Sequence, residues 1–345
     1  MSVAIIDGSP ACVRGCGNFS TKGVSLTPRR TLAPVASLFL VSLSIVATAG
    51  PAQAGHVSCG QTILVDTVLD GNLTCNVGLT IGASNITLDM AGFTLTGNAA
   101  TADGPGILVQ GRTGVTVKNG TVTLWDAGVA IVGGSGNTVT GMRALDNRGT
   151  TLTDFGDGIA LFSSNSNRVT NNQVRNNGPY DGIGVVGGDF NVIDSNQVAD
   201  NNQASNNTSG IRLENLGFNG ANDNVVTNNQ VSRSGLDGIQ VFAGGSRNQI
   251  KFNAVFASPR DGINVFAGGA SNVIEGNSLR SNGQSGIRIR GAAGSFPAPS
   301  GNQVLRNSSL GNGQFDLRDD NPNCGTNQWQ GNQGLTLTPP CTKNP

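Results

Sequence analysis

Residues 237–255 read DGIQVFAGGSRNQIKFNAV and residues 261–279 read DGINVFAGGASNVIEGNSL, so one unit is written twice at a step of 24 residues. Each unit holds two phrases: Gly-Ile with an apolar residue two places on, and two Asn that stand five residues apart. The Gly-Ile phrase begins at Asp157, Asp181, Ser209, Asp237, Asp261 and Ser285, with weaker copies at Pro105 and Ala127. The Asn phrase occurs at Asn167/Asn172, Asn191/Asn196, Asn224/Asn229, Asn248/Asn253 and Asn272/Asn277, and less completely at Asn302/Asn307. Such self-similarity is typical of a solenoid.

The apolar residues of each unit alternate with a period of two, which predicts short strands separated by Gly, Asn or Asp. No hairpin turn such as Asn-Gly joins strands that could pair within a unit, so each strand must pair with its equivalent one repeat later. Every sheet is then parallel, and the crossovers of parallel strands are nearly always right-handed. We therefore expect an all-β, single-stranded, right-handed parallel β-helix with three strands per coil and about 9–11 coils.

Composition excludes several classes of protein. The 21 basic residues balance the 21 acidic ones, which gives no electrostatic reason to expect nucleic acid as a partner. Gly occurs 51 times and Asn 40 times, while charged residues make up only 12% of the chain, which excludes a helical protein. His56 is the only histidine, so a Ser-His-Asp hydrolase and a His-rich zinc site are excluded.

The amino end is typical of an export signal. Arg29 and Arg30 precede an apolar run at 31–49, and Ala52-Gln53-Ala54 forms a small-x-small cleavage site. A membrane anchor is the alternative, but the run is short and contains Pro, Ser and Thr. We predict a signal peptide and leader at 1–54, an N-terminal cap with the first coils at 55–100, β-helix repeats at 101–312 and a C-terminal cap at 313–345. The mature protein would be secreted or periplasmic, without a membrane span.

Four cysteines remain after the leader is removed, as one close pair at each end of the chain. In an exported protein they indicate disulfides, and the local pairing is Cys59–Cys75 with Cys324–Cys341. Four cysteines allow three pairings. Zinc is a further alternative, although neither pair has CxxC spacing.

The repeated Asn and Asp have structural interpretations. Asn tolerates the left-handed backbone of a sharp corner, and its amide can bond the Asn one coil away. The Asp that opens a Gly-Ile phrase can accept backbone N–H bonds at the corner. The alternative is that Asp237 and Asp261, one coil apart, hold Ca²⁺.

These phrases resemble the repeats of the right-handed parallel β-helix superfamily, which includes pectate lyases, polygalacturonases, alginate epimerases and NosD-like proteins. The opening Cys59-Gly-Gln-Thr-Ile and the closing Asp316-Leu-Arg-Asp also resemble secreted bacterial members. The resemblance covers roughly residues 55–345 and implies the fold, but one fold hosts many activities. Pectate lyases would imply Ca²⁺-binding acids with an Arg or Lys base, and polygalacturonases a cluster of Asp. The epimerase-type Asp-Pro-His motif is absent.

Parity along the Gly-Ile strand predicts one outward face that could bind a ligand. Its central residues are Phe242, Phe266, Gln240 and Asn264, which lie between the pair Arg212/Glu214 and the pair Arg288/Arg290. Aromatic rings stack on sugar rings, and guanidinium groups grip carboxylates at two points. The alternative is an ordinary solvated face with the Phe residues under a corner loop. Trp125-Asp126 is a further exposed-looking candidate, unless Trp125 only caps the core.

The sequence favours a monomeric, non-catalytic protein that binds extracellular or cell-envelope polysaccharide and requires no cofactor. The alternative is a polysaccharide-active enzyme, a polyuronate lyase before a glycoside hydrolase. An enzyme would use Glu214 with Arg212 as acid and base, Asp237 and Asp261 for Ca²⁺, and Arg288 or Arg290 to hold a carboxylate.

Overall fold

The computed structural model describes residues 53–54, 56–98, 104–149, 156–201, 209–215 and 220–343. The predicted signal peptide lies outside these residues, except that Gln53–Ala54 of the expected cleavage site form strand β1, which pairs with β3. The described part is all-β, with two short 3₁₀ helices, η1 (Pro322–Cys324) and η2 (Pro340–Thr342). No helix among the described residues has the length and apolar character needed to cross a membrane.

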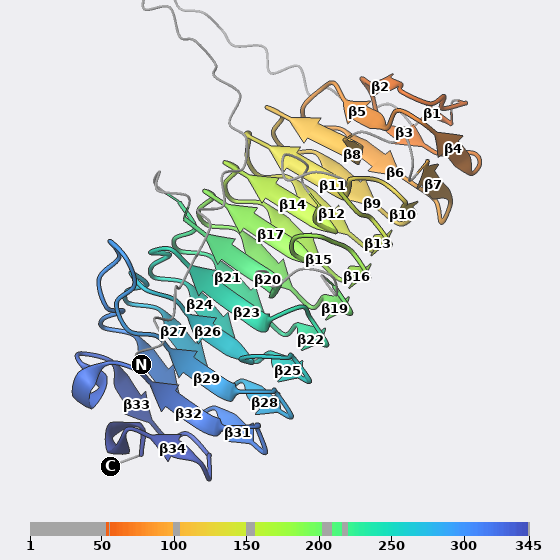
Figure 1. Cartoon of the computed structure of the whole chain (residues 1–345). Helices are drawn as coiled ribbons and strands as arrows, with labels where there is room; N and C mark the ends of the chain where they lie inside the picture. The colour runs from red at the N-terminus through yellow and green to blue at the C-terminus, as the bar shows by residue number, and fades with distance from the viewer. Residues whose placement is uncertain are drawn as a thin grey trace, which may run out of the picture. The chain divides into compact units, whose positions relative to one another are not determined.

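The strands form three parallel sheets (Figure 1), and each coil from β3 to β32 contributes one strand to each of them, while β1, β2, β33 and β34 at the ends add to two sheets only. Sheet A contains β1 (Gln53–Ala54), β3 (Thr67–Val68), β6 (Thr87–Asp89), β9 (Thr116–Lys118), β12 (Thr138–Thr140), β15 (Arg168–Thr170), β18 (Val192–Asp194), β21 (Val225–Thr227), β24 (Gln249–Lys251), β27 (Val273–Glu275), β30 (Gln303–Leu305) and β33 (Gln328–Gln330). Sheet B contains β2 (Thr62–Ile63), β5 (Leu79–Ile81), β8 (Pro105–Gln110), β11 (Ala127–Val132), β14 (Ile159–Phe162), β17 (Ile183–Val186), β20 (Ser209–Glu214), β23 (Asp237–Phe242), β26 (Ile263–Val265), β29 (Ser285–Ile289), β32 (Phe315–Asp319) and β34 (Leu337–Thr338). Sheet C contains β4 (Leu73–Cys75), β7 (Thr94–Gly97), β10 (Thr121–Thr123), β13 (Arg143–Leu145), β16 (Gln173–Arg175), β19 (Gln197–Ala199), β22 (Gln230–Ser232), β25 (Ala254–Phe256), β28 (Ser278–Arg280) and β31 (Ser308–Leu310).

The register of sheet B confirms that equivalent residues of successive repeats lie side by side. Ile263 pairs with Ile239 on one side and with Ile287 on the other. All three are fully buried, so the inward residues form an apolar ladder through the core. The predicted β-helix is therefore confirmed, with the Gly-Ile phrase of each repeat in sheet B.

The glycine of the Gly-Ile phrase is required because of close packing. A Cβ added to Gly238 would lie 2.1 Å from Val255 Cγ1 and 2.7 Å from the backbone oxygen of Gly262. These separations are well below van der Waals contact, so any larger residue would push the neighbouring coils apart.

The repeated Asn form the predicted ladders. Asn191, for example, donates from its backbone N and from Nδ2 to Oδ1 of Asn224, at 2.8 and 3.1 Å. One part of the prediction is wrong, because the left-handed residue of each corner is the one before the ladder Asn. Arg247 (φ 57°) and Phe252 (φ 54°) have this conformation immediately before Asn248 and Asn253. The ladder Asn is selected for its amide, and the corner residue before it can be of several types.

Both predicted disulfides are present, Cys59–Cys75 and Cys324–Cys341, with Cα separations of 5.3 and 6.1 Å. Cys75 and Cys324 are buried at opposite ends of the solenoid core. The local pairing holds, and no sulfur of these four residues is free to bind zinc.

Candidate functional site

Four side chains form a continuous stack across adjacent coils on the outside of sheet B. The guanidinium carbon of Arg212 (β20) lies 4.2 Å from the ring centre of Phe242 (β23). The rings of Phe242 and Phe266 have their centres 4.8 Å apart, at an angle of 35°. The guanidinium carbon of Arg290 lies 5.3 Å from the ring centre of Phe266. We call these four residues the Arg–Phe platform, in which each cation lies over an aromatic face.

Only one end of the platform is accessible. Phe242, Phe266 and Arg290 are partly exposed. Arg212 and Glu214 are 3% and 1% exposed, with Arg212 Nε 3.2 Å from Glu214 Oε2. The expectation that this acid–base pair would lie on an open face is therefore wrong. Parity fixes the side of a strand on which a residue lies, but not whether another layer covers that side.

The polar residues beside the platform are also covered. Gln240 Nε2 and Asn264 Nδ2 donate to Asp237 Oδ2, at 3.0 and 2.8 Å. Arg260 binds Asp237 through both Nε and Nη2, and Asp237 Oδ1 accepts the backbone N–H of Asp261. The predicted corner role of Asp237 is thus confirmed. Gln240 and Asn264 serve to satisfy a buried carboxylate and do not face solvent.

The ion pairs continue as an alternating chain toward the C-terminal end. Asp261 lies between Arg260 and Arg288, with N···O distances of 3.8 and 3.7 Å. Arg288 bonds Asp320 at 2.7 Å, and Asp320 in turn bonds Arg318 at 2.6 Å.

Among the described residues, no group of three or more His, Cys, Asp or Glu could hold a metal ion. Arg260 already neutralises Asp237, which disfavours a second cation there. Calcium binding by Asp237 and Asp261 stays a prediction.

Burial shifts the pKa values of two residues beside the platform, Asp261 and Arg290. Burial, followed by repulsion from Asp237, raises the pKa of Asp261 to about 6. Burial, together with the nearby Arg260 and Arg288, lowers the pKa of Arg290. Arg290 Nε is buried without a hydrogen-bond acceptor, and no carboxylate of the described residues forms an ion pair with Arg290. Arg290 is therefore a cation beside an aromatic ring without a direct ion-pair partner, and Asp237 and Asp261 act on it only at longer range.

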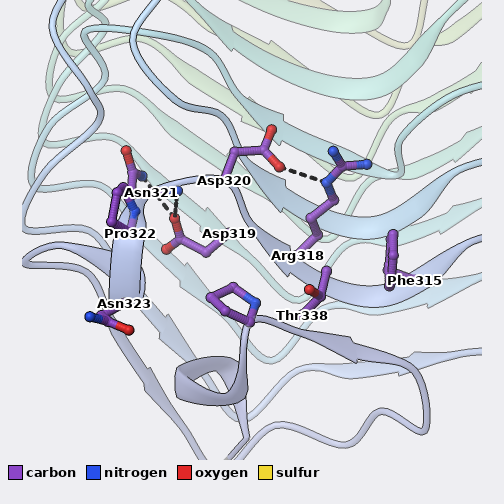
Figure 2. Close-up of a pocket in the computed structure, with 9 residues that line it drawn as sticks. Phe315, Arg318, Asp319, Asp320, Asn321, Pro322, Asn323 and Thr338 are labelled. Carbon is purple, nitrogen blue, oxygen red and sulfur yellow. Dashed lines mark hydrogen bonds and ion pairs between the residues drawn. The ribbon is translucent and has the colours of Figure 1, made fainter.

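A cavity of about 350 Å³ continues this face at its C-terminal end (Figure 2). Phe315 and Arg318 line it, with the Arg318 guanidinium carbon 5.5 Å from the ring centre of Phe315. Asp319 also borders the cavity, but its carboxylate accepts bonds from Asn321, and from Trp329 at 3.0 Å. Arg318 and Phe315 thus add a further Arg–Phe contact to the face.

Sequence analysis did not single out Arg260, Phe315 or Arg318. Leu317 pairs with Ile287, so Arg318 occupies the same position as Arg288 one coil earlier. Extending the repeat by one copy would therefore have found Arg318. Arg260 precedes the repeat phrase at a corner, where the sequence carries no period.

Trp125 and Asp126 do not form an exposed site. Trp125 is buried and its Nε1 donates to the backbone oxygen of Leu95 at 3.2 Å. Asp126 Oδ1 accepts the backbone N–H of Gly156 at 2.9 Å. Trp125 caps the core, as the alternative interpretation held.

Two family descriptions match the chain. Residues 144–338 match the family described as periplasmic copper-binding protein (NosD), and residues 59–216 match the right handed beta helix region. No curated protein matches the sequence.

Several solved structures have the same fold at low sequence identity. The periplasmic alginate epimerase AlgG, as a double mutant, is 16% identical with a TM-score of 0.53, over 74% of this chain and 68% of that one. The A-module of mannuronan C-5 epimerase AlgE6 from Azotobacter vinelandii is 16% identical with a TM-score of 0.53, over 80% and 73%. The Dettilon tailspike protein gp208 is 18% identical with a TM-score of 0.57, over 77% and 54%. At these identities the likeness shows the fold alone.

Proposed function

The chain belongs to the NosD family of right-handed β-helix proteins, and from this premise we propose that it is an exported protein that binds an acidic polysaccharide without transforming it. The binding surface is the accessible end of the Arg–Phe platform together with the cavity at Phe315 and Arg318. The two disulfides and the periplasmic description of the family support an oxidising compartment.

The state of Arg290 carries this proposal. A half-buried guanidinium without a partner is costly, and a ligand carboxylate would compensate its charge through two parallel hydrogen bonds. Phe266, under the same guanidinium, offers a flat apolar surface to the C–H face of a sugar ring. A sugar ring that bears a carboxylate, a uronate, satisfies both groups at once. AlgG and AlgE6 are named for alginate and mannuronan, which are polymers of uronates.

Burial of the nearby acids supports binding over catalysis. Glu214, Asp237 and Asp261 are the carboxylates closest to the platform in sequence and register, and each is at most 1% exposed. Asp320, which lines the cavity, is more exposed but is paired with Arg288 and Arg318. A general acid or base must reach the proton that it transfers. The alternative, a polyuronate lyase that used one of these carboxylates as its acid or base, would require that group to touch the substrate.

Copper, which the family description names, does not fit the described residues. Copper is bound by imidazole, thiolate and thioether groups. His56 is largely exposed, with Nδ1 3.4 Å from Asp70 as its polar neighbour. The four described cysteines are in disulfides, and Met90 and Met142 are buried separately in the core. We therefore assign copper no part in the proposed function.

The test is calorimetric titration of the full chain with hexamannuronate and hexagalacturonate. Arg290→Met and Phe266→Ala should each weaken binding about tenfold or more, which is the loss expected for a charge-assisted or stacking contact. Arg280 and Phe256 provide matched controls, because they form the same contact at the same 5.3 Å on sheet C. Arg280→Met and Phe256→Ala should leave binding unchanged.

Two results would overturn the proposal. Equal losses in the sheet B and sheet C variants would mean that the platform is not the site. Unsaturated products, seen as rising ultraviolet absorbance when the chain is incubated with either polyuronate and Ca²⁺, would replace binding by lyase activity.

A further inference from the structure

Sheet C carries a second cavity that shares no residue with the Arg–Phe platform. Its volume is about 500 Å³, within the range of small-ligand clefts. Its lining comes from β13, β16 and the corner residues that follow β13, β16 and β19, namely Arg143, Leu145, Asp146, Gln173, Arg175, Asn176 and Asp200.

The cavity is lined by one apolar side chain, Leu145, and by six polar ones. Leu145 is half-buried and points outward from β13, between Arg143 on one side and Asp146 on the other. Arg143 Nε donates to Gln173 Oε1 at 3.1 Å, which joins the two coils along one wall. Asn176 Nδ2 donates to Asp146 Oδ1 along the opposite wall, and Arg148 holds the Asn176 oxygen at 2.7 Å. Neighbouring side chains therefore fix both walls.

The carboxylate of Asp200, at another side of the cavity, is already paired with two arginines. Arg175 Nε lies 3.0 Å from Asp200 Oδ2, and Arg233 binds the same carboxylate through Nε and Nη2 at 2.6 and 2.9 Å. Arg233, followed by Arg175, holds the pKa of Asp200 below its usual range, so this carboxylate stays ionised. The charges that remain for a ligand are one cation, Arg143, and one anion, Asp146, on opposite walls.

This arrangement favours a neutral sugar. A carboxylate such as Asp146 can accept hydrogen bonds from two adjacent hydroxyl groups, while the Arg143 guanidinium donates to hydroxyl or ring oxygens. Leu145 would contact the apolar face of the ring. Asp200 is already paired with Arg175 and Arg233, and the attraction of a uronate carboxylate to Arg143 is offset by its repulsion from Asp146, so a negative charge on the sugar brings no net gain here.

We propose that the cavity lined by Leu145 binds a neutral pyranose unit, so that the protein carries two glycan sites of different charge preference on two of its faces. The proposal does not depend on the platform. Failure to find uronate binding at sheet B would not contradict the neutral-sugar proposal, and failure to find neutral-sugar binding would not contradict the uronate proposal.

Calorimetric titration of the full chain with cellohexaose and mannohexaose, with hexamannuronate as the acidic probe, tests the proposal. Asp146→Asn keeps the acceptor that Asn176 uses but removes the charge, and Arg143→Met removes the opposite donor. Each should weaken binding of the neutral hexasaccharide about tenfold, with the thermal midpoint unchanged because both residues lie at the surface. Gln230→Ala, on the same sheet two coils beyond Gln173, is the matched control and should change nothing.

Arg290→Met should likewise leave neutral-sugar binding intact. The proposal is wrong if neither neutral hexasaccharide binds, or if Asp146→Asn and Arg143→Met bind it as tightly as the unaltered chain does.

Discussion

Asn272 Oδ1 accepts two hydrogen bonds from Asn248 one coil earlier, from the backbone N at 2.9 Å and from Nδ2 at 3.1 Å. Both residues are fully buried, and Asn248 also donates to the backbone oxygen of Ala221 at 2.8 Å. One side chain thus satisfies backbone groups of its neighbours at a corner where the sheets have ended. The ladder continues sheet-like hydrogen bonding through the turn.

Replacing one member of this ladder should be costly. Asn248→Ala removes the acceptor for the backbone N and Nδ2 of Asn224, and the donor to Ala221. Each buried group left unsatisfied costs about 1–3 kcal/mol, so the free energy of unfolding should fall by about 3 kcal/mol or more. Denaturant unfolding followed by circular dichroism measures this change. Gln249→Ala, the exposed next residue, should change it by less than about 0.5 kcal/mol. Similar losses in the two variants would contradict a structural role for the ladder.

Stability should also be sensitive to substitution of the glycine that precedes the inward Ile. Gly238→Ala places a Cβ 2.1 Å from Val255 Cγ1, and we expect a loss of about 1–3 kcal/mol from overpacking. Gly71→Ala is the control, because no atom lies within 4 Å of its added Cβ. The two thermal midpoints should therefore differ clearly, with Gly71→Ala close to the unaltered chain. A tolerated Gly238→Ala would show that the coils can separate without cost.

The fold could be predicted because the repeat encodes it redundantly. Any one of the six Gly-Ile phrases could be lost without hiding the period, and strands too short to pair internally leave parallel stacking as the only solution. The disulfide pairing could be predicted from the closeness of the two cysteines at each end of the sequence.

The site could be predicted only as a row of residues. Parity placed Phe242, Phe266 and Arg290 correctly on the outside of sheet B. It could not show that Glu214 is buried or that Arg260 fills the space beside Asp237, because both depend on groups outside the periodic strand. The interactions that break the repeat are those that a periodic argument cannot supply.

Asp261 should make the free energy of unfolding fall as pH rises. Its pKa rises from 3.8 to about 6 on folding, so between these values the folded chain holds a proton that the unfolded chain has lost. Its contribution to stability is complete below pH 3.8 and is lost as pH rises through about 6. Asp261→Asn removes this dependence and keeps an oxygen for the backbone N–H of Ser285.

The measurement is the difference in unfolding free energy between the unaltered chain and Asp261→Asn, taken from pH 4 to pH 7. This difference should shift against the unaltered chain by up to about 3 kcal/mol as pH rises. Carboxylates with lowered pKa, such as Asp200, act in the opposite direction but are common to both proteins and cancel. If the unaltered chain loses no stability relative to Asp261→Asn as pH rises, or gains stability, then Asp261 is ionised throughout this range beside Arg260 and Arg288.

The chain should not retain copper, although its family is described by that metal. Copper affinity requires several imidazole or sulfur ligands in one place, and the described residues offer only His56 outside disulfides and the core. Cys12→Ser/Cys16→Ser replaces the two cysteines that lie outside the described residues. This variant, equilibrated with Cu²⁺ and desalted, should hold far less than an equimolar amount by atomic absorption. A positive control is Gln197→His/Gln230→His, which sets two imidazoles in register on adjacent strands of sheet C and should raise retention. Equimolar copper in the variant without added histidines would show that ligands suited to the metal exist, and would return copper to the function of this protein.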